Sequence, residues 1–163
     1  MTTSFDGDAL LSAAERAAEM PAAAAEESFD VLTFWVAGEL YGLRLSEVSE
    51  VAKLPAITPV PGLPDVLLGA VNLRGEVLAV ADLATLLGLG AARMGPDARL
   101  VMVNAGGERA GLLVDRIGDL VAAVPASRSG GADIVALQAL LPDGSLVALL
   151  SVDRVVEALS RGA

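Results

Sequence analysis

The sequence contains neither cysteine nor histidine among its 163 residues. Without cysteine the chain has no disulfide, no thiolate nucleophile and no cysteine-ligated metal, which fits a reducing compartment. Without histidine it has no imidazole base, no histidine-ligated zinc or iron and no phospho-accepting histidine. A nucleophile elbow, a P-loop and zinc-ligand spacing are also missing from the sequence. These absences exclude much enzyme chemistry, so we expect no catalytic residue, no metal site and no cofactor.

Aromatic residues are scarce, at 3% of the chain, although 54% of the residues are hydrophobic and the mean hydropathy is +0.61. The core must therefore be built mainly from closely packed Val, Leu, Ile and Ala. No apolar run reaches the roughly 18 residues that a bilayer span needs. The N-terminus also lacks the basic start and apolar centre of a secretion signal. We expect a cytoplasmic protein without direct membrane contact.

Basic residues are few, and the net charge of −10 is unevenly distributed. Residues 1–30 hold seven acidic residues and one basic residue, Arg16, and so carry −6 of this charge. Such a surface repels phosphate backbones and anionic lipids, which argues against nucleic-acid and membrane-surface roles. Because residues 1–28 have few large apolar side chains, we expect a disordered, acidic, Ala-rich extension there, followed by one folded domain over 29–163.

From Val31 onward, short β-rich runs are separated by Gly, Pro and Asn, a pattern that predicts an all-β fold. The runs are Val31–Val36, Tyr41–Leu45, Leu67–Leu73, Val77–Ala81, Leu100–Asn104, Ala110–Val114, Ile117–Val124 and Leu146–Leu150. Poor alternation of apolar and polar residues within runs indicates strands covered on both faces, as where two small barrels pack together. Two short helices are expected, one capped by Asp82 and one near the C-terminus capped by Ser151.

A weak internal repeat appears when the chain is aligned with itself at a shift of 69 residues. The matched pairs are Gly38 and Gly107, Glu39 and Glu108, Gly42 and Gly111, Leu43 and Leu112, Leu45 and Val114, Val48 and Ile117, Glu50 and Asp119, and Gly75 and Gly144. The repeat predicts two similar barrels, the first over about 31–90 and the second over about 99–160.

The repeat also draws attention to the turn Asn72-Leu73-Arg74-Gly75. Under the same shift, Arg74 falls on Asp143, which lies in an ordinary Pro-Asp-Gly turn. Turn formation therefore does not require a guanidinium, whereas arginine offers a fixed fork of donors to carboxylates or backbone carbonyls. We infer a specific interaction at this turn, with a solvated arginine as the simpler alternative. Glu50, an acid among apolar residues, is the expected partner of Arg74.

These residues resemble the CheW coupling proteins, whose fold also forms the regulatory domain of CheA kinases. The resemblance runs from about Val31 to Leu159. Its most specific part is LLGAVNLRGEV at residues 67–77, followed by Val80-Ala81-Asp82-Leu83. Supporting matches are Tyr41-Gly42-Leu43, Val48-Ser49-Glu50-Val51, Ile57-Thr58-Pro59-Val60-Pro61 and Gly111-Leu112-Leu113-Val114-Asp115.

The resemblance implies two interlocked five-stranded SH3-like barrels without catalytic activity. It implies three kinds of partner: the cytoplasmic tip of methyl-accepting chemoreceptors, the regulatory domain of a CheA-type histidine kinase, and other coupling proteins in a receptor array. Receptor contacts in this family look to lie in the groove between the barrels, and they carry over to Val48, Glu50, Gly69, Asn72, Arg74 and Gly75. Kinase contacts carry over less specifically, to Gly111, Leu112 and Val114.

The predicted function is thus a chemotaxis-type scaffold protein in signal transduction. Two departures from the family pattern, Gln138 in place of a glycine and Ser151 in place of an aspartate, bear on partner choice rather than on the fold. A CheW-like scaffold of a non-motility chemosensory pathway is therefore an alternative. A β-barrel module that binds peptides or small ligands is another, and an enzyme built on an acid pair is a third.

Overall fold

The computed structural model describes residues 28–91, 93–128 and 134–161. The predicted extension therefore lies outside the described residues, apart from Ser28. In chain order the elements are β1 (Phe29–Val36), β2 (Glu39–Arg44), the 3-10 turn η1 (Leu45–Glu47), β3 (Val48–Lys53), β4 (Leu67–Leu73), β5 (Glu76–Asp82), α3 (Leu83–Leu86), β6 (Arg99–Ala105), β7 (Glu108–Val114), β8 (Arg116–Arg128), β9 (Val135–Leu140), β10 (Leu146–Leu150) and α4 (Val152–Arg161). No helix among these is long and apolar enough to cross a membrane.

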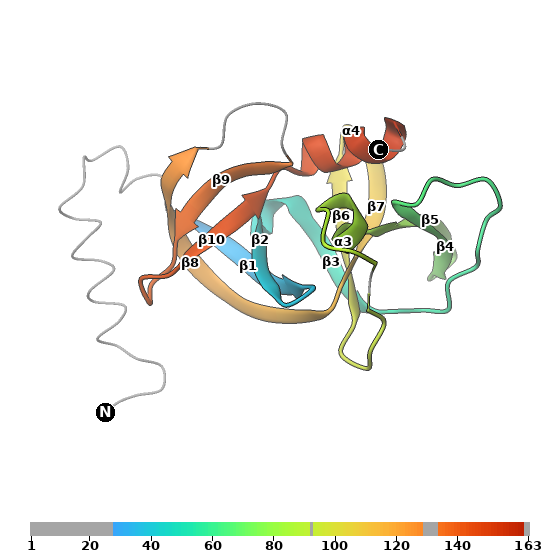
Figure 1. Ribbon diagram of the computed structural model, residues 1–163, viewed down its shortest axis with the longest axis horizontal. Helices are drawn as coiled ribbons and strands as arrows, with labels where there is room; N and C mark the ends of the chain where they lie inside the picture. Colours follow the sequence, from blue (N-terminus) through green and yellow to red (C-terminus); the bar gives the residue numbers. More distant parts are fainter. Residues whose placement is uncertain (1–27, 92, 129–133, 162–163) are drawn as a thin grey trace.

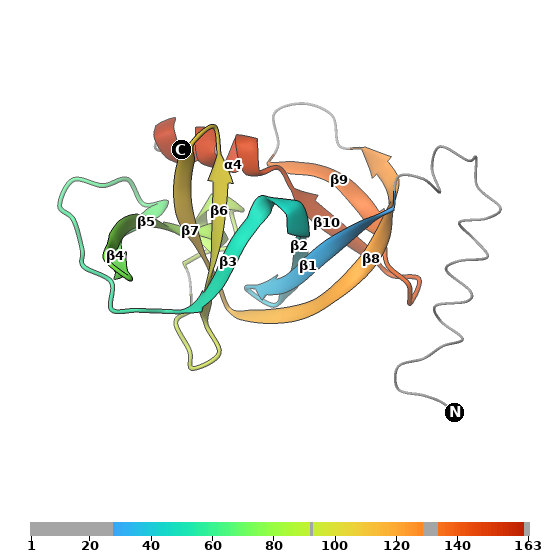
Figure 2. The same cartoon turned by 180° about the vertical axis from the view of Figure 1, so that it is seen from behind.

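The strands form two five-stranded units that lie side by side (Figures 1 and 2). One is a closed barrel with the order β1-β2-β10-β9-β8, and the other is a sheet with the order β3-β6-β7-β5-β4. Each unit contains one parallel pair, β2 with β10 and β5 with β7, and the remaining pairs are antiparallel. The predicted all-β class, with two five-stranded SH3-like units and a C-terminal helix, is confirmed.

The two units are not the consecutive segments 31–90 and 99–160 that the repeat predicted. The barrel combines β1 and β2 with β8, β9 and β10, while the second sheet combines β3, β4 and β5 with β6 and β7. The reason is that η1 leads the chain out of the barrel after β2, and Asp115 leads it back after β7. Each half of the chain therefore places its first hairpin in the sheet of the other half, and the units are interlocked.

The repeat itself is present in the structure at the level of whole elements. A shift of 69 residues places β1 on β6, β2 on β7, β3 on β8, β4 on β9 and β5 on β10, and it places α3 on the start of α4. The pairings repeat too, because β1–β8 corresponds to β6–β3 and the parallel pair β2–β10 corresponds to β7–β5. The weak sequence repeat thus marks two copies of one unit that have exchanged hairpins.

The eight predicted runs all overlap strands, but β3 and β9 were missed. Both contain polar residues that interrupt an apolar run, such as Glu50 in β3 and Gln138 in β9. Both expected helix caps are formed. The Asp82 carboxylate accepts from the Thr85 N–H at 3.2 Å, and the Ser151 hydroxyl accepts from the Arg154 N–H at 3.3 Å.

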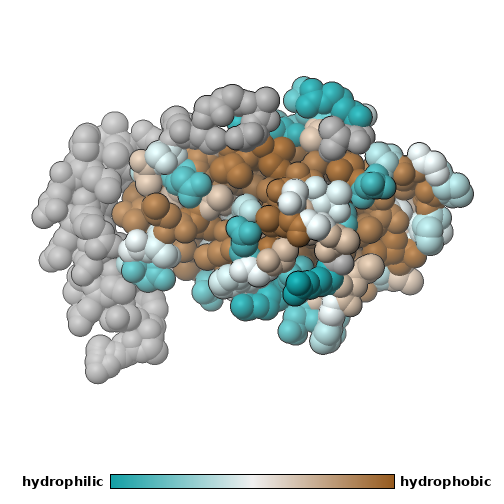
Figure 3. All heavy atoms as spheres, in the orientation of Figure 1, coloured by the Kyte–Doolittle hydropathy of each residue, from teal (hydrophilic) through white to brown (hydrophobic). Residues whose placement is uncertain are grey.

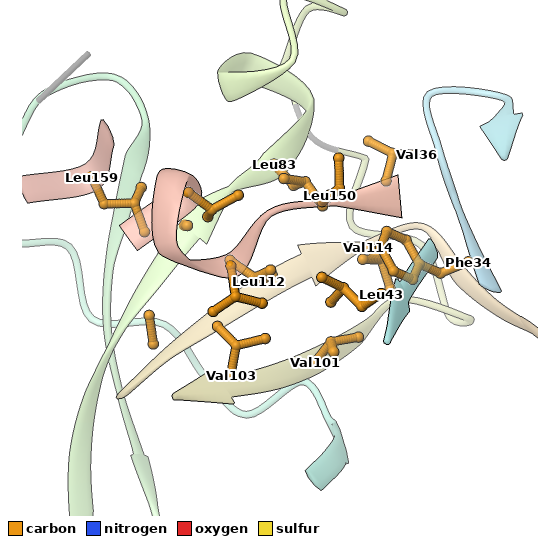
Figure 4. Close-up of a cluster of buried hydrophobic side chains, with 14 of the residues drawn as sticks. Phe34, Val36, Leu43, Leu83, Val101, Val103, Leu112, Val114, Leu150 and Leu159 are labelled. Atoms are coloured by element: carbon orange, nitrogen blue, oxygen red, sulfur yellow. The ribbon is translucent and has the colours of Figure 1, made fainter. Parts of the chain in front are cut away.

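The largest apolar cluster fills the space between the two units (Figure 4). Phe34 of β1 and Leu43 of β2 enter it from the barrel, and Val101 of β6 and Leu112 of β7 enter it from the second sheet. Leu159 of α4 covers one end of the cluster. Because strands from both units share this core, the described part of the chain forms one packed body. Some apolar side chains still reach the surface (Figure 3). Val77 and Leu146 are among the exposed large apolar residues.

The second sheet is not closed by a continuous ladder within the described residues. In the barrel, the 13-residue strand β8 continues far enough to pair with β9. Its counterpart β3 ends at Lys53, and Pro55 and Pro59, which have no N–H to donate, follow. One antiparallel bridge, between Thr58 and Ala70, joins this segment to β4. The sheet therefore has two edge strands, β3 and β4.

The shared core predicts that Leu112→Ala destabilises the whole domain, because Leu112 is 0% exposed. We expect a loss of about 2–5 kcal/mol in the free energy of unfolding, measured by urea denaturation followed through circular dichroism. Leu146→Ala is the matched control, since Leu146 is a strand leucine that is 57% exposed. Equal losses for the two variants would contradict the position of the core.

Candidate protein-interaction site

The turn between β4 and β5 has the geometry of a two-residue hairpin of type I′. Arg74 and Gly75, its central residues, have φ angles of 51° and 88°, and this turn type requires positive φ at both positions. The Asn72 side-chain oxygen accepts from the Gly75 N–H at 2.9 Å and so fixes the turn. Arginine is a poor choice for a left-handed position, where glycine, asparagine or aspartate is favoured. Backbone conformation therefore does not explain Arg74.

Glu50 lies on β3, directly after an irregularity in that strand. The register of β3 with β6 shifts between Val48 and Glu50, and the Ser49 hydroxyl donates to the Met102 carbonyl oxygen at 3.1 Å. A bulge of this kind changes the direction of the side chains that follow it. The Glu50 carboxylate accepts a hydrogen bond from the Arg74 guanidinium. The predicted Glu50–Arg74 pair is confirmed, and it joins β3 to the tip of the β4–β5 hairpin.

Both side chains of the Glu50–Arg74 pair are ionised, but the pair does not use all the hydrogen-bond donors of Arg74. The hydrogen bond from Arg74 lowers the pKa of Glu50, and the same contact raises the pKa of Arg74. Glu50 thus stays ionised in mildly acidic solution, and the contribution of the pair is lost only as the pH falls through that lowered pKa. The Arg74 side chain is 69% exposed and that of Glu50 is 22% exposed. Arg74 therefore offers further donors to the solvent side.

Gly69 has a structural explanation that needs no partner. It is buried in β4 with a φ angle of 146°, and a Cβ atom at this position would lie 2.3 Å from the Thr58 carbonyl oxygen. Its neighbour Ala70 forms the bridge with Thr58, with N–O distances of 2.8 and 2.9 Å. The missing side chain lets the proline-rich segment approach β4 closely.

The predicted receptor contacts lie at three positions in the structure. Glu50, Asn72, Arg74 and Gly75 lie together at the turn. Val48 lies two residues before Glu50 on β3, half-buried against the core between the units. The structure thus brings four of the predicted residues together at the turn, where Glu50 is partly covered and the other three are exposed, and it leaves Gly69 in the interior.

The residues predicted as kinase contacts are buried in the structure. Gly111, Leu112 and Val114 lie on β7, which is hydrogen-bonded to β6 on one side and to β5 on the other. Leu112 and Val114 are 0% exposed, and a Cβ atom on Gly111 would lie 3.2 Å from a methyl group of Leu100. The physical reason is packing, because a central strand between two layers requires small or apolar side chains.

A second ion pair next to the turn was missed. The Arg109 guanidinium on β7 donates to the carboxylate of Glu76, the first residue of β5. The two residues are 33 positions apart, and the parallel pairing of β5 with β7 brings them together. One sign of this ion pair was present in the sequence, because Glu76 and Arg109 each directly precede an apolar run. Across residues 28–91, 93–128 and 134–161, no group of three or more acidic side chains could hold a metal ion.

Comparison with known proteins gives a consistent set of matches. A family model described as CheW-like domain matches residues 30–160. The chemotaxis protein CheW of Treponema pallidum is 31% identical over 107 residues, which are 63% of this chain and 63% of that protein. Protein FrzA of Myxococcus xanthus is 35% identical over 96 residues, 59% of this chain and 60% of that protein. Protein PilI of Pseudomonas aeruginosa is 31% identical over 93 residues, 57% and 52% of the two chains.

The solved structures include a similar chain. The crystal structure of the scaffolding protein TtCheW from Thermoanaerobacter tengcongensis superposes with a TM-score of 0.67 and 29% sequence identity, and covers 76% of this chain and 84% of that chain. The matches to the first curated relatives span about three-fifths of their length.

The close approach at Gly69 predicts that Gly69→Ala destabilises the fold. The new methyl group would force the Thr58 backbone away, at a cost of about 1–3 kcal/mol in the free energy of unfolding, measured by chemical denaturation. Gly95→Ala is the control, because nothing lies within 4 Å of a Cβ atom there. If both variants unfold at the same denaturant concentration, the structural role of Gly69 is wrong.

Proposed function

Because this chain belongs to the CheW-like domain family, we propose that it is a non-enzymatic adaptor that couples chemoreceptor cytoplasmic tips to a CheA-type histidine kinase. The turn at Arg74 is the observation that carries the proposal. An arginine stands there in an unfavourable backbone conformation, with its side chain 69% exposed. A residue that the turn does not require and the core does not use is explained by a binding partner.

An adaptor of this kind acts through contacts alone. The chain has no histidine and so no phospho-accepting histidine, and the proposal therefore gives it no step in phosphoryl transfer. What it needs is a rigid body that holds two or more partners in a fixed relation. The interlocked units provide such a body, because their shared core prevents them from moving independently.

The receptor site consists of Glu50, Asn72 and Arg74, with Gly75 completing the turn. Asn72 is a positioning residue, since its side chain is hydrogen-bonded to the backbone of the turn. Arg74 is the contact residue. Glu50 holds the Arg74 guanidinium at the seam, by which we mean the place where the two edge strands β3 and β4 face each other without a ladder of hydrogen bonds. The expected partner groups are carboxylates or backbone carbonyls. In the cell, we expect the protein in the cytoplasm, recruited to receptor arrays that also contain the kinase and other coupling proteins.

Two other functions remain as candidates. One is a CheW-like scaffold of a non-motility chemosensory pathway, which the departures at Gln138 and Ser151 leave open as an alternative. An apolar pocket of about 350 Å³ supports a module that binds small ligands or peptides. It is lined by Leu54, Pro55, Ile57, Pro59, Leu68 and Met94. Receptor-tip binding without stabilisation by small apolar ligands would separate the adaptor from the ligand-binding module.

The proposed function predicts that Arg74→Ala weakens binding to a receptor-tip fragment or to the kinase regulatory domain several-fold. The substitution removes an exposed guanidinium and its hydrogen-bond donors. The melting temperature should change little, since exposed ion pairs contribute little to stability. Isothermal titration calorimetry measures the affinity. Arg161→Ala removes an exposed arginine of α4 as a control. Unchanged affinity of Arg74→Ala would remove this residue from the site.

The pairing of Glu50 with Arg74 gives a second prediction. Glu50→Arg and Arg74→Glu should each weaken receptor binding, because each leaves two like charges at the seam. The double variant restores an ion pair with reversed polarity but presents a carboxylate in place of the guanidinium, so we expect it to bind no better than Arg74→Glu in the same titration. Native affinity of Glu50→Arg would show that the pair does not organise the site.

A further inference from the structure

The turn at Arg74 is one half of a larger charged group. The Arg109–Glu76 pair lies beside the Glu50–Arg74 pair, and the two are coupled electrostatically. The charge of Arg109 acts on Glu50, and the charge of Glu76 acts on Arg74. Opposite charges thus alternate in the order Glu50, Arg74, Glu76 and Arg109, and we call these four residues the charge quartet. Three strands and one turn contribute to it, namely β3, the β4–β5 turn, β5 and β7.

The members of the charge quartet differ in exposure. Glu50 and Arg109 are largely covered, with side chains 22% and 27% exposed, whereas Arg74 and Glu76 are 69% and 49% exposed. The quartet therefore presents one cation and one anion to the solvent, on either side of Gly75. Val77 follows at the same end of the hairpin and is 70% exposed. A positive, a negative and an apolar side chain are thus exposed within four residues of the chain.

The other copy of the repeat shows that the fold does not require this group. At the shift of 69 residues, Arg74 falls on Asp143, Glu76 on Ser145 and Arg109 on Leu40. The corresponding turn is held by a hydrogen bond of 2.6 Å from the Ser145 hydroxyl to the Asp143 carboxylate. One copy of the unit therefore forms its hairpin without the ion pairs, so the alternating charges are particular to the copy that carries the Arg74 site.

We propose that Glu76 and Arg109 extend the receptor site into a charge-selective surface, which accepts a protein partner that presents an acidic side chain to Arg74 and a basic side chain to Glu76. The inference rests on the proposed function and deepens it by naming the chemistry of the partner surface. Glu76 is a specificity-determining residue, because it repels an all-acidic surface that Arg74 alone would attract. Arg109 is a positioning residue that holds Glu76.

The test is the binding of the full chain to receptor cytoplasmic-tip fragments, measured by titration calorimetry at low and high salt. Glu76→Lys places two cations at the surface and repels the basic residue of the partner, so we expect binding about 10-fold weaker at low salt. The tip is then scanned by changing its lysines and arginines one at a time to glutamate. We expect one such tip variant to regain affinity for Glu76→Lys and to lose affinity for the native chain.

A matched control separates local from general charge effects. Glu157→Lys makes the same charge change in an exposed ion pair of α4, and we expect it to bind like the native chain. An equal loss in Glu157→Lys would overturn the inference, because net charge alone would then explain the effect. If Glu76→Lys lowers the melting temperature, Glu76→Gln takes its place, with a several-fold loss expected.

The possible outcomes also separate this inference from the proposed function. Native affinity of Glu76→Lys or Glu76→Gln for the tip would overturn the selective surface and leave receptor binding intact. Loss of binding without rescue by any tip variant would also overturn it, because the facing basic residue would not exist. If the native chain binds no receptor tip at all, the proposed function itself fails.

Discussion

The exchange of hairpins between the two sheets is the constraint on which the rest of the structure depends. Phe34 and Leu43, from the first hairpin, and Val101 and Leu112, from the hairpin of the second copy, meet in one apolar cluster. In the observed topology, each sheet combines a hairpin from one half of the chain with three strands from the other half. A chain with few aromatic residues thus obtains a large common core from Val, Leu and Ala side chains. The resulting body is rigid enough to hold separate surface sites in a fixed relation.

The candidate site lies where the two copies of the unit differ most. In the barrel, β8 continues until it pairs with β9, whereas the proline-rich segment after β3 returns to β4 through the bridge between Thr58 and Ala70. Gly69 makes that close return possible. The seam left between β3 and β4 is spanned at one end by the ion pair of Glu50 and Arg74. One local difference in backbone closure therefore creates both an open edge and the charged group beside it.

The charges at this site are better suited to recognition than to stability. Exposed ion pairs are screened by solvent and salt, and they contribute little to the free energy of unfolding. Across an interface the same charges choose among partners, because a wrong arrangement places like charges opposite each other. In the proposed adaptor, such charges contribute to the choice of partner. The net charge of −10 also favours a role in selective protein recognition, since it disfavours nonspecific contact with nucleic acids and anionic lipids.

The sequence by itself determined the all-β class, the two helix caps, the internal repeat and the ion pair of Glu50 with Arg74. These features depend on local turn chemistry, on short apolar runs and on a comparison of corresponding positions, all of which can be read in one dimension. Gly111, Leu112 and Val114, which the family resemblance proposed as kinase contacts, are buried, and a family pattern alone does not distinguish packing from contact. The division into barrels was wrong for a related reason, since a repeat specifies elements but not which copy their edges pair with.

Only the tertiary structure decided the strand exchange, the burial of β7, the open seam and the second ion pair. Glu76 and Arg109 are distant in the chain, and the parallel register of β5 with β7 that brings them together is fixed by long-range packing. Hydrogen-bonded edges are satisfied equally well by a strand of either copy, so local sequence leaves that choice open. The shared core makes it, because the exchanged arrangement buries the apolar faces of both hairpins at once.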